Sequence, residues 1–213
     1  MTVRLECRDS GGFIELPVGD WSSVATDAEI AVLAAARPAV IDIGCGPGRV
    51  AHALSARGTP AMGIDVSPAA VNHARMSGAT ALERSVFDPL PAEGRWGTAI
   101  LFDGNIGIGG DPVALLRRVA DLLAPDGLLL VEVGAPGTPT LAQQVRLLVP
   151  GEPAGPWFCW ARVSVDSIEE IGLRCGLDML EIRCEGGRHF AWLRTPPANN
   201  VAVPANATVL LPK

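Results

Sequence analysis

The chain has 213 residues, of which 48% are hydrophobic and 19% are charged, and its formal net charge is −6. This length and this hydrophobic share are typical of a single folded domain and exclude a chain that is disordered throughout. The acidic excess argues against a general nucleic-acid binder, which needs basic side chains to neutralise phosphates.

We expect neither a membrane span nor a signal peptide in this chain. Apolar runs such as residues 127–133 are far shorter than the roughly 20 residues that cross a bilayer. Residues 1–12 include Glu6 and Asp9 and contain no apolar signal-peptide core. The five cysteines form no C-x-x-C pair, which indicates free thiols rather than disulfides or a metal site. The expected protein is cytoplasmic, with no membrane partner and no metal.

Strand and helix patterns alternate through the middle of the chain. We expect strands at 39–44, 60–65, 80–86, 98–102 and 128–133, with helices at 47–57, 67–78 and 111–123. A further helix at 164–175, with Ser167 and Glu170 as a capping box, precedes a hairpin of 177–184 and 189–194. Strands separated by helices pair in parallel through right-handed crossovers. The sequence therefore predicts a doubly wound α/β fold: a mostly parallel, seven-stranded sheet with a C-terminal antiparallel hairpin.

Three segments lie outside this pattern. Residues 2–20 resemble a small hairpin that turns at 10–12. Residues 134–163 contain five prolines and a possible strand at 145–149, which makes them a candidate lid or substrate segment. Residues 195–213 are rich in Pro, Asn and Ala, as is typical of a weakly packed tail. We interpret residues 1–213 as one domain whose core spans 38–134.

The sharpest motif is Asp42-Ile43-Gly44-Cys45-Gly46-Pro47-Gly48, between a predicted strand and a predicted helix. Glycines let the backbone turn tightly and approach a ligand, and the N–H groups of the helix start face an anion. A dinucleotide fingerprint, G-x-G-x-x-G, would need a glycine where this chain has Arg49. Asp65 ends the next strand, where a carboxylate can accept hydrogen bonds from both ribose hydroxyls or can cap the next helix instead.

Five runs together resemble class I S-adenosylmethionine-dependent methyltransferases: VIDIGCGPGRVAHALSARG, GIDVSPAAVNHAR, SVFDPLP, GTAILFDGN and LLAPDGLLLVEV. The resemblance covers roughly residues 38–134 and, loosely, the last helix and hairpin. The stretch DGNIGIGGDP is similar to uncharacterised bacterial small-molecule methyltransferases. The resemblance implies S-adenosyl-L-methionine as cofactor, S-adenosyl-L-homocysteine as product and a small nucleophile as methyl acceptor.

The resemblance also implies which residues bind the cofactor. The residues expected around its methionine and ribose portions are Asp42, Gly44, Cys45, Gly46 and Gly48. Asp65 would hold the ribose diol, Val66 would lie beside the adenine, and Phe87 and Asp88 would contact the adenine ring and its amino group. Asp103 and Gly104 would lie near the methyl and amino groups. Asp88 has the alternative role of a turn residue before a proline.

Candidates for the acceptor site follow the fourth strand and the proline-rich segment. Asn105 is the candidate catalytic and acceptor-binding residue, and its loss should then lower turnover more than cofactor affinity; its alternative is to shape a turn. Asp103-Gly104-Asn105 lacks both prolines and the aromatic residue of the amino-group methylase signature D/N-P-P-Y, which argues against methylation of DNA bases.

Three aromatic residues, Trp157, Phe158 and Trp160, are candidates for an apolar wall of the acceptor pocket. In a strand, Phe158 and Trp160 would share one face and Trp157 would lie on the other. The alternative is that all three pack the extra segment onto the sheet.

Two other functions stay open at this point. A non-catalytic S-adenosylmethionine-binding module would keep the same glycine loop. An NAD-dependent oxidoreductase would keep the ribose-binding acid, although Arg49 stands where its fingerprint needs a glycine.

Overall fold

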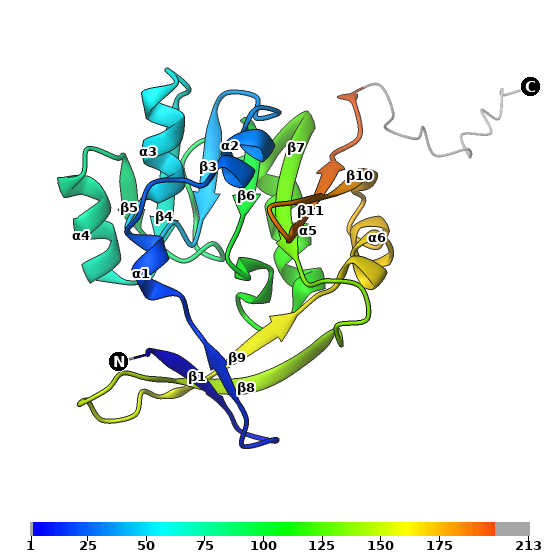
Figure 1. The fold of residues 1–213 in the computed structure, drawn as a ribbon. Helices are drawn as coiled ribbons and strands as arrows, with labels where there is room; N and C mark the ends of the chain where they lie inside the picture. Colours follow the sequence, from blue (N-terminus) through cyan, green and yellow to red (C-terminus); the bar gives the residue numbers. More distant parts are fainter. Residues whose placement is uncertain (1, 199–213) are drawn as a thin grey trace, which may run out of the picture.

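The computed structural model describes residues 2–198, which form two β-sheets (Figure 1). The larger sheet has seven strands in the order β10-β11-β7-β6-β3-β4-β5. Its parallel strands are β3 (Val40–Ile43), β4 (Ala61–Asp65), β5 (Ala81–Glu83), β6 (Trp96–Leu101) and β7 (Leu123–Val133), and its hairpin consists of β10 (Asp178–Glu185) and β11 (Arg188–Arg194). β11 is antiparallel to both β7 and β10. The predicted fold class is confirmed.

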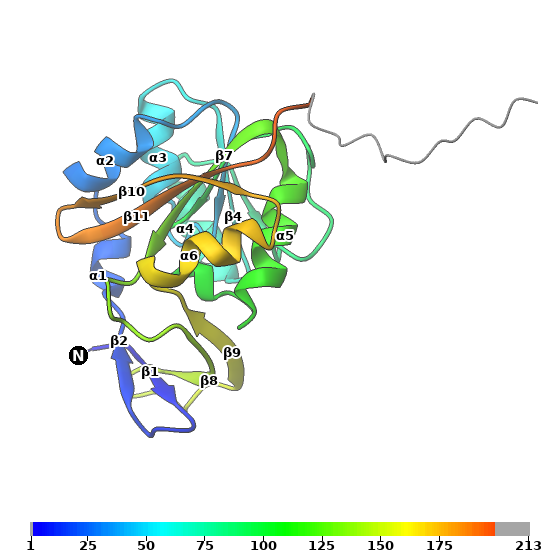
Figure 2. The same cartoon turned by 90° about the vertical axis from the view of Figure 1, so that its right-hand side faces the viewer.

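Helices cover both faces of the large sheet (Figure 2). They are α1 (Val18–Trp21), α2 (Asp27–Leu33), α3 (Arg49–Ala56), α4 (Pro68–Met76), α5 (Pro112–Leu122) and α6 (Val165–Leu173), with the 3-10 helix η1 (Asn105–Gly107) after β6. Residues of α2 and α3 pack with Val40, Ile100 and Leu130, whereas residues of α5 and α6 pack with Ile41 and Leu129. Because side chains alternate along a strand, these two sets lie on opposite faces of the sheet.

The helix starts were partly predictable. Ser67 caps α4 by accepting from the Ala70 N–H (3.3 Å), and Asp111 caps α5, as the Ser-Pro and Asp-Pro pairs predict. The capping box of Ser167 and Glu170 is wrong, because α6 already begins at Val165 with Ser164 at its N-cap. Ser167 therefore lies inside the first turn, where its N–H bonds to the Ser164 carbonyl (3.1 Å).

Helix α2 was not predicted, although its sequence carries a capping signal. Thr26 Oγ1 accepts from the Glu29 N–H (3.3 Å), and Glu29 Oε2 accepts from the Thr26 N–H (2.8 Å). This reciprocal pair is a capping box. It fixes Glu29 in the first turn of α2, where the side chain is fully buried.

A second sheet lies beyond the carboxyl ends of the parallel strands (Figure 1). Its four strands, all antiparallel, are β2 (Phe13–Glu15), β1 (Arg4–Cys7), β8 (Leu141–Leu148) and β9 (Trp157–Arg162). The N-terminal hairpin and the proline-rich segment, which the sequence suggested as separate features, therefore form one unit. We refer to it as the small sheet. Its inner face is apolar: Leu5, Cys7 and Val145 are buried there, and Ile14, Leu16 and Trp160 pack against them.

The small sheet contacts the large one through the segment after β6. Ile108, directly after η1, forms an isolated antiparallel bridge with Trp160 of β9. Gly107 makes this approach possible, because a Cβ at this position would overlap the Ala161 carbonyl oxygen. The space between the two sheets is therefore closed on the η1 side by direct backbone contact.

Other differences from the predicted elements are local. β5 ends at Glu83, because the Ser85 N–H bonds to Asp88 Oδ2 (3.2 Å) and turns the chain. β7 begins at Leu123, directly after α5. Thr195 Oγ1 donates to the Ala124 carbonyl (2.7 Å), so the start of the predicted tail is anchored, while residues 199–213 of that tail lie outside the described residues. No helix within residues 2–198 is long and apolar enough to cross a membrane.

Candidate active site

The glycine loop follows β3 at the centre of the large sheet. Gly44, Gly46 and Gly48 all have positive φ values (+72°, +53° and +94°), which favour glycine. At Gly44 a Cβ would also lie only 2.6 Å from Asn105 Nδ2, and at Gly48 it would lie 2.8 Å from the Ala74 Cβ. The loop therefore needs glycine both for its backbone turns and for its close packing.

Two side chains from neighbouring strands hold this loop. Asp65, at the end of β4, accepts from the Gly46 N–H through Oδ2 (2.9 Å) and from the Ser67 N–H through Oδ1 (2.8 Å). Asn105, after β6, donates its Nδ2 hydrogens to the carbonyls of Ile43 and Gly44 (2.9 Å each). The structure thus gives Asn105 a role in fixing the loop, which the sequence did not reveal.

Two cavities meet along this loop. A small one, of about 110 Å³, is lined by Asp42, Arg49 and Asp103, among others. A larger one, of about 610 Å³, is lined by apolar residues that include Val66 and Phe158. The two share Gly44 of the loop and the two residues that hold the loop, Asp65 and Asn105. An elongated molecule with a polar end and a flat apolar end would fit along this line.

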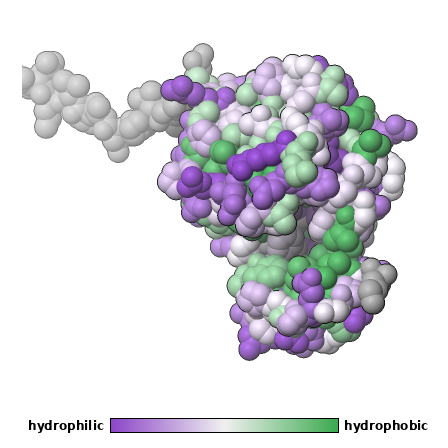
Figure 3. Space-filling view, turned by 90° about the vertical axis from the view of Figure 1, so that its left-hand side faces the viewer, coloured by the Kyte–Doolittle hydropathy of each residue, from purple (hydrophilic) through white to green (hydrophobic). Residues whose placement is uncertain are grey.

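A third cavity, of about 700 Å³, lies between the large and the small sheet, and we call it the acceptor cavity after the methyl acceptor that the sequence leads us to expect. It shares Trp21, Arg49 and Asp103 with the small cavity and Trp160 with the apolar one. Figure 3 shows a hollow between the larger upper part and the smaller lower part of the molecule, bordered by hydrophobic residues. The three cavities therefore meet at the carboxyl ends of β3 and β6, where ligands bind in open α/β sheets.

A network of ion pairs lies where the small cavity meets the acceptor cavity. Arg49 binds Glu29 and Asp103, and both Arg49 and Glu29 have at most 5% exposed side chains. Arg188, at the start of β11, binds Glu29 (2.8 Å), Glu132 (2.6 Å) and Asp103 (3.1 Å). Burial acts to raise the pKa of Glu29, but the hydrogen bonds from Arg188 and from the Thr26 N–H, with the charge of Arg49, lower it overall. We call these five acidic and basic residues the ion-pair network.

Asp42 lies beside this network without taking part in it. Its Oδ2 is buried and has no hydrogen-bond partner among the described residues. Burial raises the pKa of Asp42 to about 7, and the negative charge of Asp103 adds to this, while Arg49 opposes it. Asp42 therefore combines an unpartnered polar atom with a charge that changes near neutral pH.

Most of the predicted cofactor residues come together in these cavities. Those that line them are Asp42, Gly44, Cys45, Gly46, Asp65, Val66, Asp103 and Gly104. Gly48 instead forms the N-cap of α3. Burial raises the pKa of the Cys45 thiol, which packs so tightly on Gly63 that a Cβ there would lie 2.5 Å from Sγ. Cys45 is therefore an uncharged packing residue of the loop.

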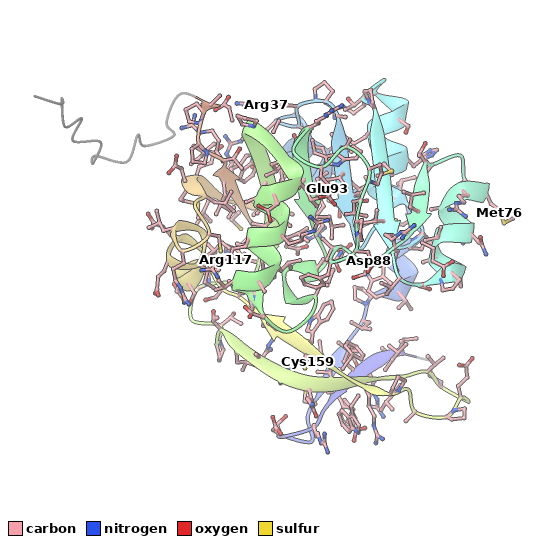
Figure 4. The ribbon with its side chains drawn as sticks, turned by 180° about the vertical axis from the view of Figure 1, so that it is seen from behind. Arg37, Met76, Asp88, Glu93, Arg117 and Cys159 are labelled. Carbon is pink, nitrogen blue, oxygen red and sulfur yellow. The ribbon has the colours of Figure 1, made fainter. Side chains whose placement is uncertain are left out.

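Phe87 and Asp88 lie behind residues that line the cavity beside Val66, rather than in its lining. Asp88 lies on the segment between β5 and β6 (Figure 4). Its carboxylate accepts from the Ser85 N–H in a turn, and its backbone carbonyl accepts from Arg118 (2.8 Å). The Phe87 ring approaches Gly109. Neither residue is part of the lining described above. The geometry favours the turn role that the sequence left open for Asp88.

The three aromatic residues of β9 separate as strand alternation predicts. Phe158 and Trp160 form an edge-to-face pair (6.1 Å between centroids) and both line the apolar cavity. Trp157 lies on the other face of the small sheet, where the guanidinium groups of Arg146 (4.6 Å) and Arg8 (5.5 Å) stack on its ring. The structure thus keeps two of the three as candidate wall residues and removes Trp157.

Several residues of the site had not been predicted. The sequence analysis gave no role to Trp21, Glu29, Glu132 or Arg188, and it used Arg49 only to exclude a fingerprint. Glu29 could have been found from the capping-box spacing Thr26-x-x-Glu29. Glu132 could have been found as the charged residue within the otherwise apolar strand LLLVEV. Residues 2–198 hold no group of three or more His, Cys, Asp or Glu side chains suited to a metal ion.

Comparison with known families agrees with this geometry. A family model described as a methyltransferase domain matches residues 25–182. The chain belongs to this family. The match favours a methyltransferase over the NAD-dependent oxidoreductase that the sequence left open. A separate comparison with curated proteins gave no match.

Solved structures show the same fold in other methyltransferases. A SAM-dependent methyltransferase from Bacteroides fragilis, in complex with S-adenosyl-L-homocysteine, has a TM-score of 0.76 and 22% identity, covering 92% of this chain and 88% of that one. CcbJ methyltransferase from Streptomyces caelestis has a TM-score of 0.63 and 16% identity, covering 83% and 92%. Burkholderia thailandensis 1,6-didemethyltoxoflavin-N1-methyltransferase has a TM-score of 0.60 and 16% identity, covering 79% and 76%. At these identities the likeness concerns the fold of the methyltransferase domain.

The ion-pair network predicts a large stability effect for Glu29. We expect Glu29→Ala to lower the free energy of unfolding by about 3–5 kcal/mol, because it removes the buried carboxylate that Arg49 and Arg188 share and leaves two arginine charges around a broken network. Urea unfolding followed by circular dichroism measures this change. Glu181→Ala is the matched control, since its pair with Arg183 is exposed and worth at most about 1 kcal/mol. Equal losses in the two variants would contradict the structural role of the network.

Asp42 predicts a dependence of stability on pH. Its pKa is raised from 3.8 to about 7 in the folded protein, so its contribution to stability is fully present below pH 4 and is lost as the pH rises through 7. We expect Asp42→Asn, which does not titrate, to gain stability relative to the parent over this range, by a few kcal/mol at pH 8. Urea unfolding of both cofactor-free proteins from pH 4 to pH 8 tests this, and a constant difference would contradict it.

Proposed function

We propose that this methyltransferase uses S-adenosyl-L-methionine and transfers its methyl group to a small molecule. The observation that carries the proposal is the line of three cavities that meet at the glycine loop. The apolar cavity beside Asp65 suits a nucleoside, the small cavity suits a charged amino acid end, and the acceptor cavity opens where the two meet. Methyltransferases that share the fold have been solved with S-adenosyl-L-homocysteine or S-adenosylmethionine bound, which supports this cofactor.

The residues of the two inner cavities fit this cofactor. Asp65 would hold the ribose hydroxyls, with Val66 and Phe158 against the adenine. The Asp103 carboxylate, which the resemblance assigns to the amino group, is already bound by Arg49 and Arg188. The unpartnered Oδ2 of Asp42 therefore supports Asp42 as the acid that receives the cationic amino group.

The chain contributes to the reaction mainly by position. The cofactor supplies an activated methyl group, which an acceptor nucleophile removes by direct displacement. Asp65 and Asn105 fix the loop that sets the depth of the cofactor, and Trp160 closes the space between the apolar and the acceptor cavities. Gly104 leaves room beside Asp103 for the nucleophile to approach. Alignment of this kind can supply several kcal/mol of the barrier, so a dedicated general base is not required.

A small-molecule acceptor is supported by the size of the cavity and by structural neighbours. The acceptor cavity of about 700 Å³ is of the size that encloses small ligands. The Burkholderia enzyme was solved with 1,6-didemethyltoxoflavin, and another neighbour, CalS10, is an amino pentose methyltransferase. The net charge of −6 favours such an acceptor over DNA or RNA.

We further propose that residues 1–213 act as one domain in a bacterial cytoplasm. The five cysteines are free, which suits a reducing compartment. Within this domain, the small sheet covers the acceptor, so residues 134–163 serve as a substrate segment. A non-catalytic binding module is the alternative, and turnover with a panel of small nucleophiles distinguishes the two.

Asp65 provides the direct test of cofactor binding. We expect Asp65→Ala to weaken binding of S-adenosyl-L-homocysteine by about 1.5–3 kcal/mol, the range of hydrogen bonds to a charged group. Isothermal titration calorimetry with S-adenosyl-L-homocysteine, S-adenosyl-L-methionine and NADH measures this and tests the choice of cofactor.

Asp88→Ala is the matched control for this measurement, because Asp88 is not part of the cavity lining and its carboxylate bonds only to the backbone N–H of Ser85. It should leave the affinity within about twofold, since less than 0.5 kcal/mol is expected of a surface change. Unchanged affinity in a folded Asp65→Ala variant would contradict the ribose assignment. A loss in Asp88→Ala would instead support the adenine contact that the resemblance implies.

Asn105 distinguishes loop fixation from contact with the acceptor. Its two hydrogen bonds to carbonyls predict that Asn105→Ala and Asn105→Asp both weaken binding of S-adenosyl-L-homocysteine, by about tenfold, because neither side chain offers the amide donors. Calorimetry and a turnover assay on the same preparations measure both effects. If affinity is kept in both variants while turnover falls only in Asn105→Ala, Asn105 acts on the acceptor through its oxygen.

A further inference from the structure

One cation in the lining of the acceptor cavity has no partner among residues 2–198. Of its charged lining residues, Asp103 and Glu132 bind Arg49 and Arg188 within the ion-pair network. Arg162, at the end of β9, lines the same cavity. Its guanidinium forms no ion pair and no hydrogen bond with the residues that the structure describes, and its Nε is buried without an acceptor. The positive charge of Arg162 is therefore available to a bound molecule.

A second unpartnered donor belongs to another residue of the same lining. The indole Nε1 of Trp21, at the end of α1, is also buried and unpartnered among residues 2–198, and Trp21 lines the acceptor cavity as well. Buried N–H groups are nearly always hydrogen-bonded in folded proteins, because an unpaired one loses its contacts with water. Two such donors, from separate elements, in the lining of one cavity indicate that the bound molecule supplies acceptor atoms.

Strand alternation places Arg162 in apolar surroundings. Residues 158, 160 and 162 share the inner face of the small sheet, so the guanidinium follows Phe158 and Trp160 along β9. Leu5 and Ile14 line the cavity from β1 and β2. A molecule with an apolar or aromatic body and one group that accepts hydrogen bonds matches this combination.

The charge of the lining decides which group this is. One unpaired guanidinium matches one negative charge, and its planar donors fit a carboxylate. Asp103 and Glu132 lie in the lining, and Glu15 and Asp20 are exposed in it, so a dianionic phosphate would meet more repulsion than a carboxylate. An amine would leave the donors of Arg162 unpaired.

We infer that the methyl acceptor is an apolar or aromatic carboxylic acid whose carboxylate binds Arg162, with its nucleophile directed toward Asp103 and Gly104. The identity of the bound acid as the methyl acceptor rests on the proposed function. The anion site itself rests only on the cavity and its donors. Arg162 is a specificity-determining residue in this reading, because it selects the acceptor without touching the cofactor cavities.

The test compares four probes that share one ring: benzoate, benzamide, benzylamine and phenyl phosphate. Each is titrated up to 10 mM against the full chain saturated with S-adenosyl-L-homocysteine, and binding is followed by ligand-observed NMR. We expect benzoate to bind at least fivefold more tightly than each of the other three. In Arg162→Met the preference over benzamide should disappear.

Arg146→Met is the matched control, since it removes an arginine from the small sheet on the opposite face, where Arg146 stacks on Trp157. It should keep the preference for benzoate. Arg162→Lys keeps the charge without the planar donors and should retain part of the preference, which covers the case in which Arg162→Met does not fold.

Each outcome decides the inference. Absence of benzoate binding, equal binding of benzamide, an unchanged preference in Arg162→Met, or tighter binding of benzylamine or phenyl phosphate would overturn it. Calorimetry with S-adenosyl-L-homocysteine tests the proposed function independently of the anion site. If the parent protein does not bind S-adenosyl-L-homocysteine, the titrations are repeated without it: the proposed function then fails, while a preference for benzoate that depends on Arg162 still supports the anion site.

Discussion

The buried carboxylate of Glu29 connects the parts of the molecule on which the active site depends. It accepts hydrogen bonds from Arg49, in the helix that follows the glycine loop, and from Arg188, at the start of the final hairpin strand. Both arginines then bind Asp103, after β6. Charges at this depth are tolerated only when they are paired, so the glycine loop, the end of β6 and the hairpin are held in one arrangement.

This arrangement also sets the electrostatics of the cofactor site. Around the small cavity and the network, the carboxyl groups of Glu29, Asp42, Asp103 and Glu132 outnumber the guanidinium groups. The same excess of negative charge adds to burial in raising the pKa of Asp42. An acidic site favours a cationic sulfonium over the neutral thioether that remains after methyl transfer. Under the proposed function, these electrostatics therefore favour binding of the methyl donor and release of the product.

The sequence revealed the cofactor half of the site more completely than the acceptor half. Gly44 and Asp65 were predictable because each lies at the end of a strand in consecutive strand–helix units, where spacing along the chain gives position in space. The pairing of Arg188 with Glu132 depends on an antiparallel return strand, and that of β1 with β8 joins segments at opposite ends of the chain. Neither of these two pairings produces a local pattern in the sequence. Strand alternation predicted that Trp157 lies on the opposite face from Phe158 and Trp160. The cavity that Phe158 and Trp160 line, however, exists only once the small sheet is assembled.

The two sheets thus divide recognition between them. The ends of β3, β4 and β6 provide the contacts expected for the cofactor, and the inner face of the small sheet provides those that we propose for the acceptor. Trp160 is shared by both, because it lines the apolar and the acceptor cavities. Side chains along β9 alternate, so Arg162 can change without moving the glycine loop, whereas Gly107 cannot, since any side chain there would push β9 away from η1. Under the proposed function, the choice of acceptor therefore depends on the side chains of β9, and the distance between acceptor and methyl donor depends on the backbone contact that Gly107 permits.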